Sequence, residues 1–170
     1  MNNAPDGIYI EQNPQSLRIT RTWSKVAGYV MLAWIAVWIG LWSFFLSLGQ
    51  QSSGWFILAP VLPGVIMAYA ALARFVNHTL IEINASRLIV QHSPLLWLGG
   101  KKFAVRDIQK LEPQIKKVHA KQGIVHIYQI LVVRQNGKKA ILLSGLEMTE
   151  TQMIFIIEAI NAYLQNLRRV

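Results

Sequence analysis

The hydrophobic residues of this chain form two long uncharged runs, followed by a region of shorter alternating segments. The first run, residues 26–48, would span about 34 Å as an α-helix, and the second, residues 55–73, about 28 Å. Both lengths suit a bilayer core of about 30 Å. Because backbone groups in hydrocarbon must hydrogen-bond to one another, the pattern predicts a two-helix transmembrane hairpin over residues 23–76, with a short uncharged loop at 49–54.

From residue 77 onward, polar and apolar positions alternate in short segments. Alternation with a period of two is typical of half-buried β-strands. Six strands are predicted, over residues 79–84, 87–92, 101–105, 108–116, 124–135 and 138–144. Between the last two lies Asn136-Gly137, which favours a two-residue hairpin turn in which both positions take positive φ.

The C-terminal segment has the spacing of a helix. Thr149, followed three residues later by Gln152, fits a capping box. Apolar residues then recur at intervals of three and four, at Met153, Ile157, Ile160, Leu164 and Leu167. This spacing predicts one amphipathic helix. Strands followed by such a helix suggest a bent antiparallel sheet that the helix closes at one end.

The composition agrees with a chain that lies partly in lipid. Of its 170 residues, 53% are hydrophobic and 15% are charged, whereas soluble domains have about 25% charged residues. The chain has no cysteine, which excludes disulfides, thiol nucleophiles and cysteine-ligated metal sites.

Positive charges flank only the outer ends of the two apolar runs. Arg18, Arg21 and Lys25 precede the first run. Arg74 ends the second, and the loop between the runs carries no charge. Because Lys and Arg beside membrane helices stay on the cytoplasmic side, both termini are predicted to be cytoplasmic.

Two short features each have two interpretations. Ala36-x-x-x-Gly40 and Gly64-x-x-x-Ala68 are small-residue patches that allow helices to approach closely. We expect contact within the hairpin, with a dimer interface as the alternative. Trp97, next to Gly99-Gly100, is either a core residue, which we favour, or part of a loop that dips into the membrane.

Several segments resemble a known family. They are NHTLIEINASRLIVQHSPLLWLGGKKF, then RDIQKLEP, then the NGKKAILLSGL hairpin with its closing helix. Together they resemble small bacterial membrane proteins that pair a transmembrane hairpin with a pleckstrin-homology (PH)-like domain. The likeness covers residues 18–165 and is most specific at Asn77-x-Thr79 and Pro94–Trp97. It implies no catalytic activity.

The expected fold is therefore an α+β membrane protein of the bacterial inner membrane. Residues 1–22 are predicted to be a polar N-terminal tail, and 23–76 the transmembrane hairpin. Residues 77–170 are predicted to be a cytoplasmic PH-like antiparallel β-roll, capped by the C-terminal amphipathic helix. A full PH roll has seven strands, one more than the six predicted here.

The predicted PH-like domain carries most of the positive charge. Residues 79–148 contain 11 Lys and Arg against 4 Asp and Glu. A basic residue near an anionic leaflet contributes about 1 kcal/mol to binding. The candidate contacts with anionic lipid are Lys101, Lys102, Arg106, Lys116, Lys117, Lys138 and Lys139.

Motifs for catalysis or metal binding are missing from the sequence. The four histidines lack ligand spacing, and no GxSxG, P-loop or GxGxxG occurs. We therefore predict that the chain is not an enzyme and has no cofactor, metal or nucleic-acid partner. The expected function is that of a membrane-anchored PH-like binding or scaffold module. It would contact a protein partner, and anionic lipid would orient it.

Two other functions stay open. The first is a small accessory or assembly subunit of a larger inner-membrane complex, in which the hairpin makes the specific contact. The second, an enzyme acting on lipid, is the least favoured of the three. A homo-oligomer is compatible with each of them.

Overall fold

The computed structural model describes residues 4–13, 15–47, 61–120, 123–145 and 148–169. The chain forms two compact units. Met1–Thr22 and His78–Val170 together form one unit, which we call the sheet domain, and Trp23–Asn77 forms the other, which we call the helical unit. The architecture is α+β, with two antiparallel sheets and three helices among the described residues.

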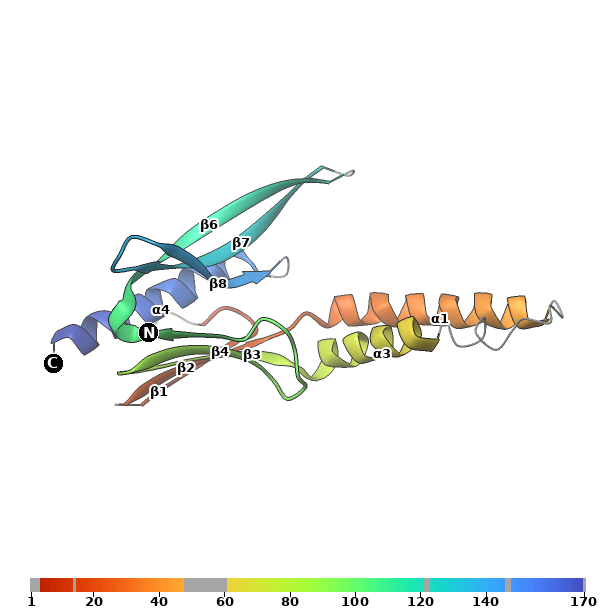
Figure 1. Ribbon diagram of the computed structural model, residues 1–170, viewed down its shortest axis with the longest axis horizontal. Coiled ribbons are helices and arrows are strands. Elements are labelled where there is room, and N and C mark those ends of the chain that lie inside the picture. Colours follow the sequence, from red (N-terminus) through yellow and green to blue (C-terminus); the bar gives the residue numbers. More distant parts are fainter. Residues whose placement is uncertain (1–3, 14, 48–60, 121–122, 146–147, 170) are drawn as a thin grey trace. The chain divides into compact units, whose positions relative to one another are not determined.

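The first sheet of the sheet domain has five antiparallel strands in the order β1-β2-β3-β4-β5 (Figure 1). The strands are β1 (Ile8–Asn13), β2 (Ser16–Thr22), β3 (His78–Asn84), β4 (Arg87–Ser93) and β5 (Lys101–Ala104). Every neighbouring pair is antiparallel. Sequence order and spatial order coincide, so the sheet is a meander with one long interruption between β2 and β3.

The prediction of a polar N-terminal tail is wrong for residues 8–13 and 16–22, which form β1 and β2. Leu17 and Ile19 alternate into the core with exposed fractions of 2% and 0%, and Ile8 joins them at 4%. Polar residues fill the intervening positions, so the apolar stripe on β2 is only two residues long. This stripe is buried because β3 lies beside β2, and β3 is distant in the sequence.

The second sheet has three antiparallel strands in the order β6-β7-β8. They are β6 (Ile108–Ala120), β7 (Gly123–Arg134) and β8 (Lys139–Gly145), and the short 3-10 helix η1 (Val105–Asp107) precedes β6. All six predicted strands are present. The largest difference is at the end of β6, which continues to Ala120 where the sequence predicts an end at residue 116.

The turn between β7 and β8 differs from the prediction. The amide of Gly137 donates to the Arg134 carbonyl, and the amide of Arg134 donates to the Lys138 carbonyl, both at 2.9 Å. Gly137 has a φ of 75°, and among the described residues only glycines have positive φ. The connection is therefore a three-residue loop in which only Gly137 takes the left-handed conformation. Asn136 stabilises it by accepting from the Lys138 amide at 3.0 Å.

Helix α4 (Glu150–Arg169) closes the core between the sheets. The predicted capping box is confirmed, since the Gln152 amide donates to Thr149 Oγ1 at 3.2 Å and Thr149 N–H donates to Gln152 Oε1 at 3.4 Å. The predicted apolar face is confirmed too, because Met153, Ile157, Ile160 and Leu164 are buried and Leu167 packs against them.

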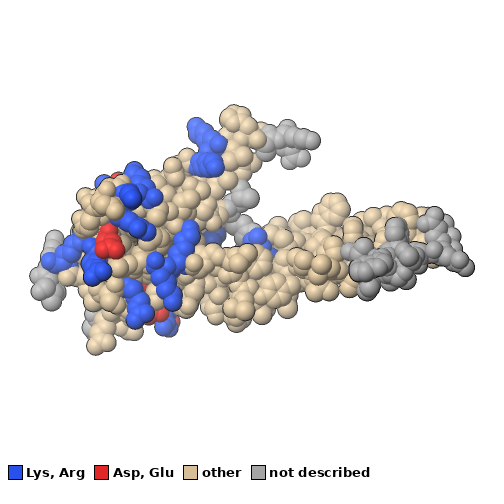
Figure 2. Space-filling view, in the orientation of Figure 1, with Lys and Arg blue, Asp and Glu red and all other residues tan. Residues whose placement is uncertain are grey.

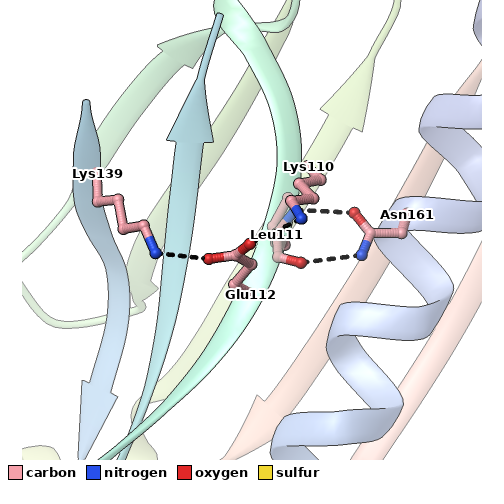
Figure 3. A network of polar contacts seen from close by, with 5 residues as sticks. All are labelled: Lys110, Leu111, Glu112, Lys139 and Asn161. Atoms are coloured by element: carbon pink, nitrogen blue, oxygen red, sulfur yellow. Dashed lines mark hydrogen bonds and ion pairs between the residues drawn. The ribbon is translucent and has the colours of Figure 1, made fainter. Parts of the chain in front are cut away.

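Asn161 fixes α4 against the edge strand β6 (Figure 3). Its Oδ1 accepts from the Leu111 amide at 2.9 Å, and its Nδ2 donates to the Leu111 carbonyl at 3.1 Å. A backbone residue on the free edge of β6 thereby has both polar groups satisfied by one side chain.

The helical unit contains α1 (Lys25–Ser47) and α3 (Val61–Val76). In the part of the chain that the structure describes, α1 is the one helix long and apolar enough to cross a membrane. The predicted second span began at residue 55, and its residues 55–60, like the predicted loop 49–54, lie outside the described residues.

Close approach of α1 and α3 occurs at a different place from the one predicted. A Cβ atom on Gly28 would lie 2.8 Å from the Phe75 ring, whereas a Cβ on Gly40 or Gly64 would meet nothing within 4 Å. The ring of Phe75 also meets Tyr29 edge-on, with centroids 5.1 Å apart. The expected close approach at the small-residue patches is therefore not found at Gly40 and Gly64.

Candidate functional site

The helical unit is inserted between two neighbouring strands of the sheet domain. Thr22, the last residue of β2, is the cross-strand partner of His78, the first residue of β3. His78 in turn is the partner of Ser93, the last residue of β4. We call this end of the five-stranded sheet, defined by Thr22, His78 and Ser93, the junction end. The chain leaves the sheet here for the helices and returns to the adjacent strand.

A buried polar row crosses the sheet one residue from the junction end. Arg21 is the cross-strand partner of Thr79, which is the partner of His92. Arg21 is 7% exposed and Thr79 is 1% exposed. Thr79 Oγ1 lies 3.1 Å from His92 Nδ1, and Arg21 Nε donates to Gln152 Oε1 at 3.3 Å. The Arg21 side chain of β2 is thus held inside the domain by Gln152 of α4, in one row with Thr79 of β3 and His92 of β4.

Two effects lower the pKa of the His92 imidazole. Burial of the imidazole lowers its pKa below the ordinary value, and the nearby Arg21 guanidinium lowers this pKa further. Both effects disfavour the imidazolium form. The hydroxyl and imidazole of Thr79 and His92 have the spacing of a nucleophile and its base, but the Thr79 side chain is buried away from any substrate. The pair therefore has a structural role, in which it joins the neighbouring strands β3 and β4.

Gln152 connects this row to the start of α4 and to the N-terminal residues. Besides its capping bonds and its bond from Arg21, its Nε2 donates to the Asp6 carbonyl at 2.9 Å. Thr22 Oγ1 donates to the Gly7 carbonyl at 3.3 Å. These contacts fasten the beginning of the chain to the junction end.

The structure does not bring the seven predicted lipid contacts together. Figure 2 shows that, on the visible face, Lys and Arg are spread over the surface and outnumber Asp and Glu. Lys116 and Lys117 lie on the outer half of β6, opposite Ile127 and His126. Lys101 and Lys102 lie on β5 beside Val90 and Ile89, and the Lys101 amine donates to the Ile141 carbonyl at 2.6 Å.

The other three predicted contacts are Arg106, Lys138 and Lys139. They lie around the opposite end of the sheet domain, where β6 begins and β7 ends. Arg106 is in η1 and forms an ion pair with Asp107 at 3.6 Å. Lys138 follows Gly137 in the β7–β8 loop. We call this region, around Ile108 and Arg134, the far end.

Lys139 is compensated by an acidic partner. Glu112 accepts from both Lys139 and Lys110 at 2.8 Å (Figure 3). Hydrogen bonds from Lys110 and Lys139 lower the pKa of the Glu112 carboxyl to about 2. The carboxylate stays ionised, so this group offers less positive charge to an anionic surface than the sequence suggests.

A depression of about 320 Å³ lies at the far end. Its lining residues are Ala85, Val105, Arg106, Gln135, Leu164, Leu167 and Arg168. Arg168 is already engaged, because its Nη2 donates to the carbonyls of Ile108 and Gln109 at 2.6 and 2.9 Å. Its guanidinium thus anchors the end of α4.

No group of three His, Asp or Glu within the described ranges could hold a metal ion. No protein-family model matches the chain, and no curated protein matches it.

Sequence reasoning missed the polar row and the surroundings of Trp97. Arg21 carried a signal, because it continues the alternating row of Leu17 and Ile19 at a spacing of two residues. Trp97 is partly exposed and is outside the buried core. Its neighbours Leu96 and Leu98 are 89% and 93% exposed, so this segment is a surface loop rather than a core segment.

Proposed function

We propose that this chain is an integral membrane protein, and that its helical unit anchors a PH-like binding module at the cytoplasmic face of the bacterial inner membrane. The observation that carries the proposal is the insertion between β2 and β3. Both connections between the units start from adjacent strand ends, so a membrane-spanning helical unit would hold the sheet domain at the bilayer surface by two short tethers.

Both helices of the unit are needed for this topology. If α1 crosses the bilayer and the chain returns to the adjacent strand, α3 must cross it in the opposite direction. The described part of α3 has 16 residues and is about 24 Å long. The uncharged run that contains it begins earlier, at residue 55, which supports a full second span.

A five-stranded and a three-stranded antiparallel sheet, closed by one C-terminal helix, support a PH-like roll. The arrangement has eight described strands, one more than the seven of a PH roll. The two strands that the sequence did not predict are the N-terminal strands β1 and β2. A domain of this kind binds partners through its surface.

Binding rather than catalysis is supported by the contacts of the reactive groups. The Thr79 hydroxyl is buried beside the half-buried His92 imidazole, and Glu112 is paired with two lysines. The exposed polar surface is mainly basic. We infer that the module binds a membrane-protein partner, and that anionic lipid orients it.

The exposed small residues favour a second candidate function, an accessory or assembly subunit of a larger membrane complex. Ala36, Gly40 and Ala68 are exposed in the chain by itself, and Gly64 has open space beside it. Such patches suit contact with helices of another protein. Replacement of residues 25–76 by an unrelated hairpin would separate the candidates, because partner recovery would survive only if the sheet domain makes the contact.

Single cysteines test the anchor directly, because the native chain has none. We expect a membrane-impermeant maleimide to label Lys138→Cys only from the cytoplasmic side. Ser52→Cys, between the two apolar runs, should be labelled only from the periplasmic side. Release of the full chain from membranes by alkaline carbonate, or labelling of both positions from one side, would refute the two-span topology.

A further inference from the structure

Helix α4 and strand β6 run antiparallel and lie side by side. Their contacts therefore relate positions on β6 to positions on α4. Arg168 bonds to the Ile108 carbonyl, and Asn161 bonds to Leu111. Seven residues of helix cover about 10 Å, and three residues of strand cover about 10 Å. The distance between the two contacts is therefore the same along α4 and along β6, and the two elements run in opposite directions.

The same contacts place the tip of β6 beyond the level of Gln152. From Asn161 back to Gln152 the helix advances about 13 Å, which on β6 corresponds to four residues, from Leu111 to Ile115. Gln152 bonds to Arg21, one residue from the junction end. Measured along α4, residues 116–120 should therefore continue about 16 Å beyond the level of Gln152.

The outer part of the β6–β7 hairpin is exposed at residues 115–119 and 123–126, and we call these residues the ribbon. Strand β8 pairs with β7 between Tyr128 and Val133. The described part of the ribbon therefore consists of β6 and β7 without β8 (Figure 1). The exposed fractions of Ile115, Ile124 and Val125 are 45%, 55% and 40%. A two-stranded ribbon with apolar side chains in water is marginally stable, so this one is suited to an apolar surface.

The charge on the ribbon has one sign. Lys116 and Lys117 are exposed, and the sequence from residue 113 to 128 contains no Asp or Glu. Exposed aliphatic residues interleaved with lysines match the interface of an anionic bilayer, where headgroups attract the amines and acyl chains take up the aliphatic groups.

A second apolar element begins at the junction end itself. The β4–β5 loop follows Ser93, the cross-strand partner of His78. In this loop Leu98 is 93% exposed. It is the most exposed of the large hydrophobic residues that the structure describes outside the masked segments.

We propose that the ribbon and the β4–β5 loop enter the interface of the anionic bilayer into which the helical unit is inserted. The proposal rests on the proposed function, since it needs α1 to cross the membrane. Only residues 23–24 separate Thr22 from α1, so the bilayer surface would lie within about 10 Å of the junction end. The ribbon, which extends about 16 Å beyond the level of Gln152, is longer than this distance.

The division of the basic residues follows from this arrangement. Lys116 and Lys117 lie on opposite faces of the ribbon, which on this proposal enters the interface, while Arg106 and Lys138 lie at the far end. Two pairs of exposed cations, equal in charge, are thus available for comparison. Only the ribbon pair is predicted to act on lipid.

Spin labels on the full chain test the proposal. Cysteines replace His119 on the ribbon, Leu98 in the loop, Val37 in α1 and Asn166 at the far end, one at a time. Each protein is reconstituted in vesicles rich in phosphatidylglycerol and in vesicles of phosphatidylcholine. We expect accessibility to oxygen over a nickel chelate to place Val37 in hydrocarbon, His119 and Leu98 in the interface of the anionic vesicles, and Asn166 in water.

The paired cations supply the matched control. Lys116→Gln with Lys117→Gln should weaken the ribbon contact about 30-fold, since each lysine contributes roughly fivefold. Arg106→Gln with Lys138→Gln should leave it unchanged. Salt at 1 M should also release the ribbon, because the Debye length falls from about 10 Å at 0.1 M to about 3 Å.

The outcomes separate the two proposals. A Val37 label outside hydrocarbon would overturn the membrane anchor. A Val37 label in hydrocarbon with the His119 and Leu98 labels in water would overturn only the interface contact, and would leave a protein partner as the occupant of the ribbon. Equal effects of the two double substitutions would also overturn it, because position on the domain would then have no influence.

Discussion

Replacement of Asn161 by alanine should destabilise the sheet domain more than its partial exposure suggests. This side chain satisfies both backbone polar groups of Leu111, at 2.9 and 3.1 Å. The Leu111 side chain is 2% exposed and packs in the core. Alanine would leave an amide and a carbonyl on the edge of β6 without these partners.

The expected loss is about 2–4 kcal/mol, since an unsatisfied buried polar group costs about 1–3 kcal/mol. Domains of this size have a total stability of about 5–15 kcal/mol, so the unfolding midpoint should fall by on the order of 10 °C. Asn166→Ala is the matched control, because Asn166 is an exposed residue of the same helix. Both substitutions raise helix propensity by a similar amount, and this term cancels in the comparison.

Pulse proteolysis of the full chain in detergent measures the stability, and amide hydrogen exchange reports the site. We expect faster exchange in Asn161→Ala at the Leu111 amide, with Asn166→Ala unchanged within about 0.5 kcal/mol. Equal midpoints for the two variants would refute the reasoning, because the double hydrogen bond would then contribute nothing to the packing of α4 on β6.

Two further predictions concern the helical unit and the polar row. Gly28→Leu should separate α1 from α3, since even a Cβ there would lie 2.8 Å from the Phe75 ring. The control Gly40→Leu should leave the protease resistance of the helical unit intact. Equal protease sensitivity of the two variants would contradict the close approach at Gly28. Because the pKa of His92 is lowered in the folded state, its contribution to stability should be complete above the unfolded value of about 6.5 and be lost as pH falls from there toward the folded pKa. His92→Gln should flatten that part of the stability profile, and an Arg21→Gln chain should titrate His92 at higher pH by NMR; an unchanged profile would exclude this role.

Local patterns determined the elements of this protein well. A run without charge dictates a helix wherever its backbone has no water to bond to, and α1 follows the first run closely. Alternation with a period of two located most of the strands from β3 to β8, because several apolar residues lie on one face of strands such as β3 and β7. The capping box and apolar spacing of α4 are local as well, so Thr149, Gln152 and the buried face were readable in advance.

Tertiary structure alone decided which of these elements meet. β2 is buried by β3, which follows it only after the whole helical unit, and a short stripe such as Leu17 and Ile19 has no local signature of that neighbour. The polar row needs Arg21, Thr79 and Gln152, which register and helix docking bring together across the chain. Likewise, β6 continues beyond the part of β7 that pairs with β8 and carries Lys116 and Lys117 away from the other lysines. The number of charges along a sequence does not predict where in the domain each charge lies, because strand pairing determines the position of each side chain.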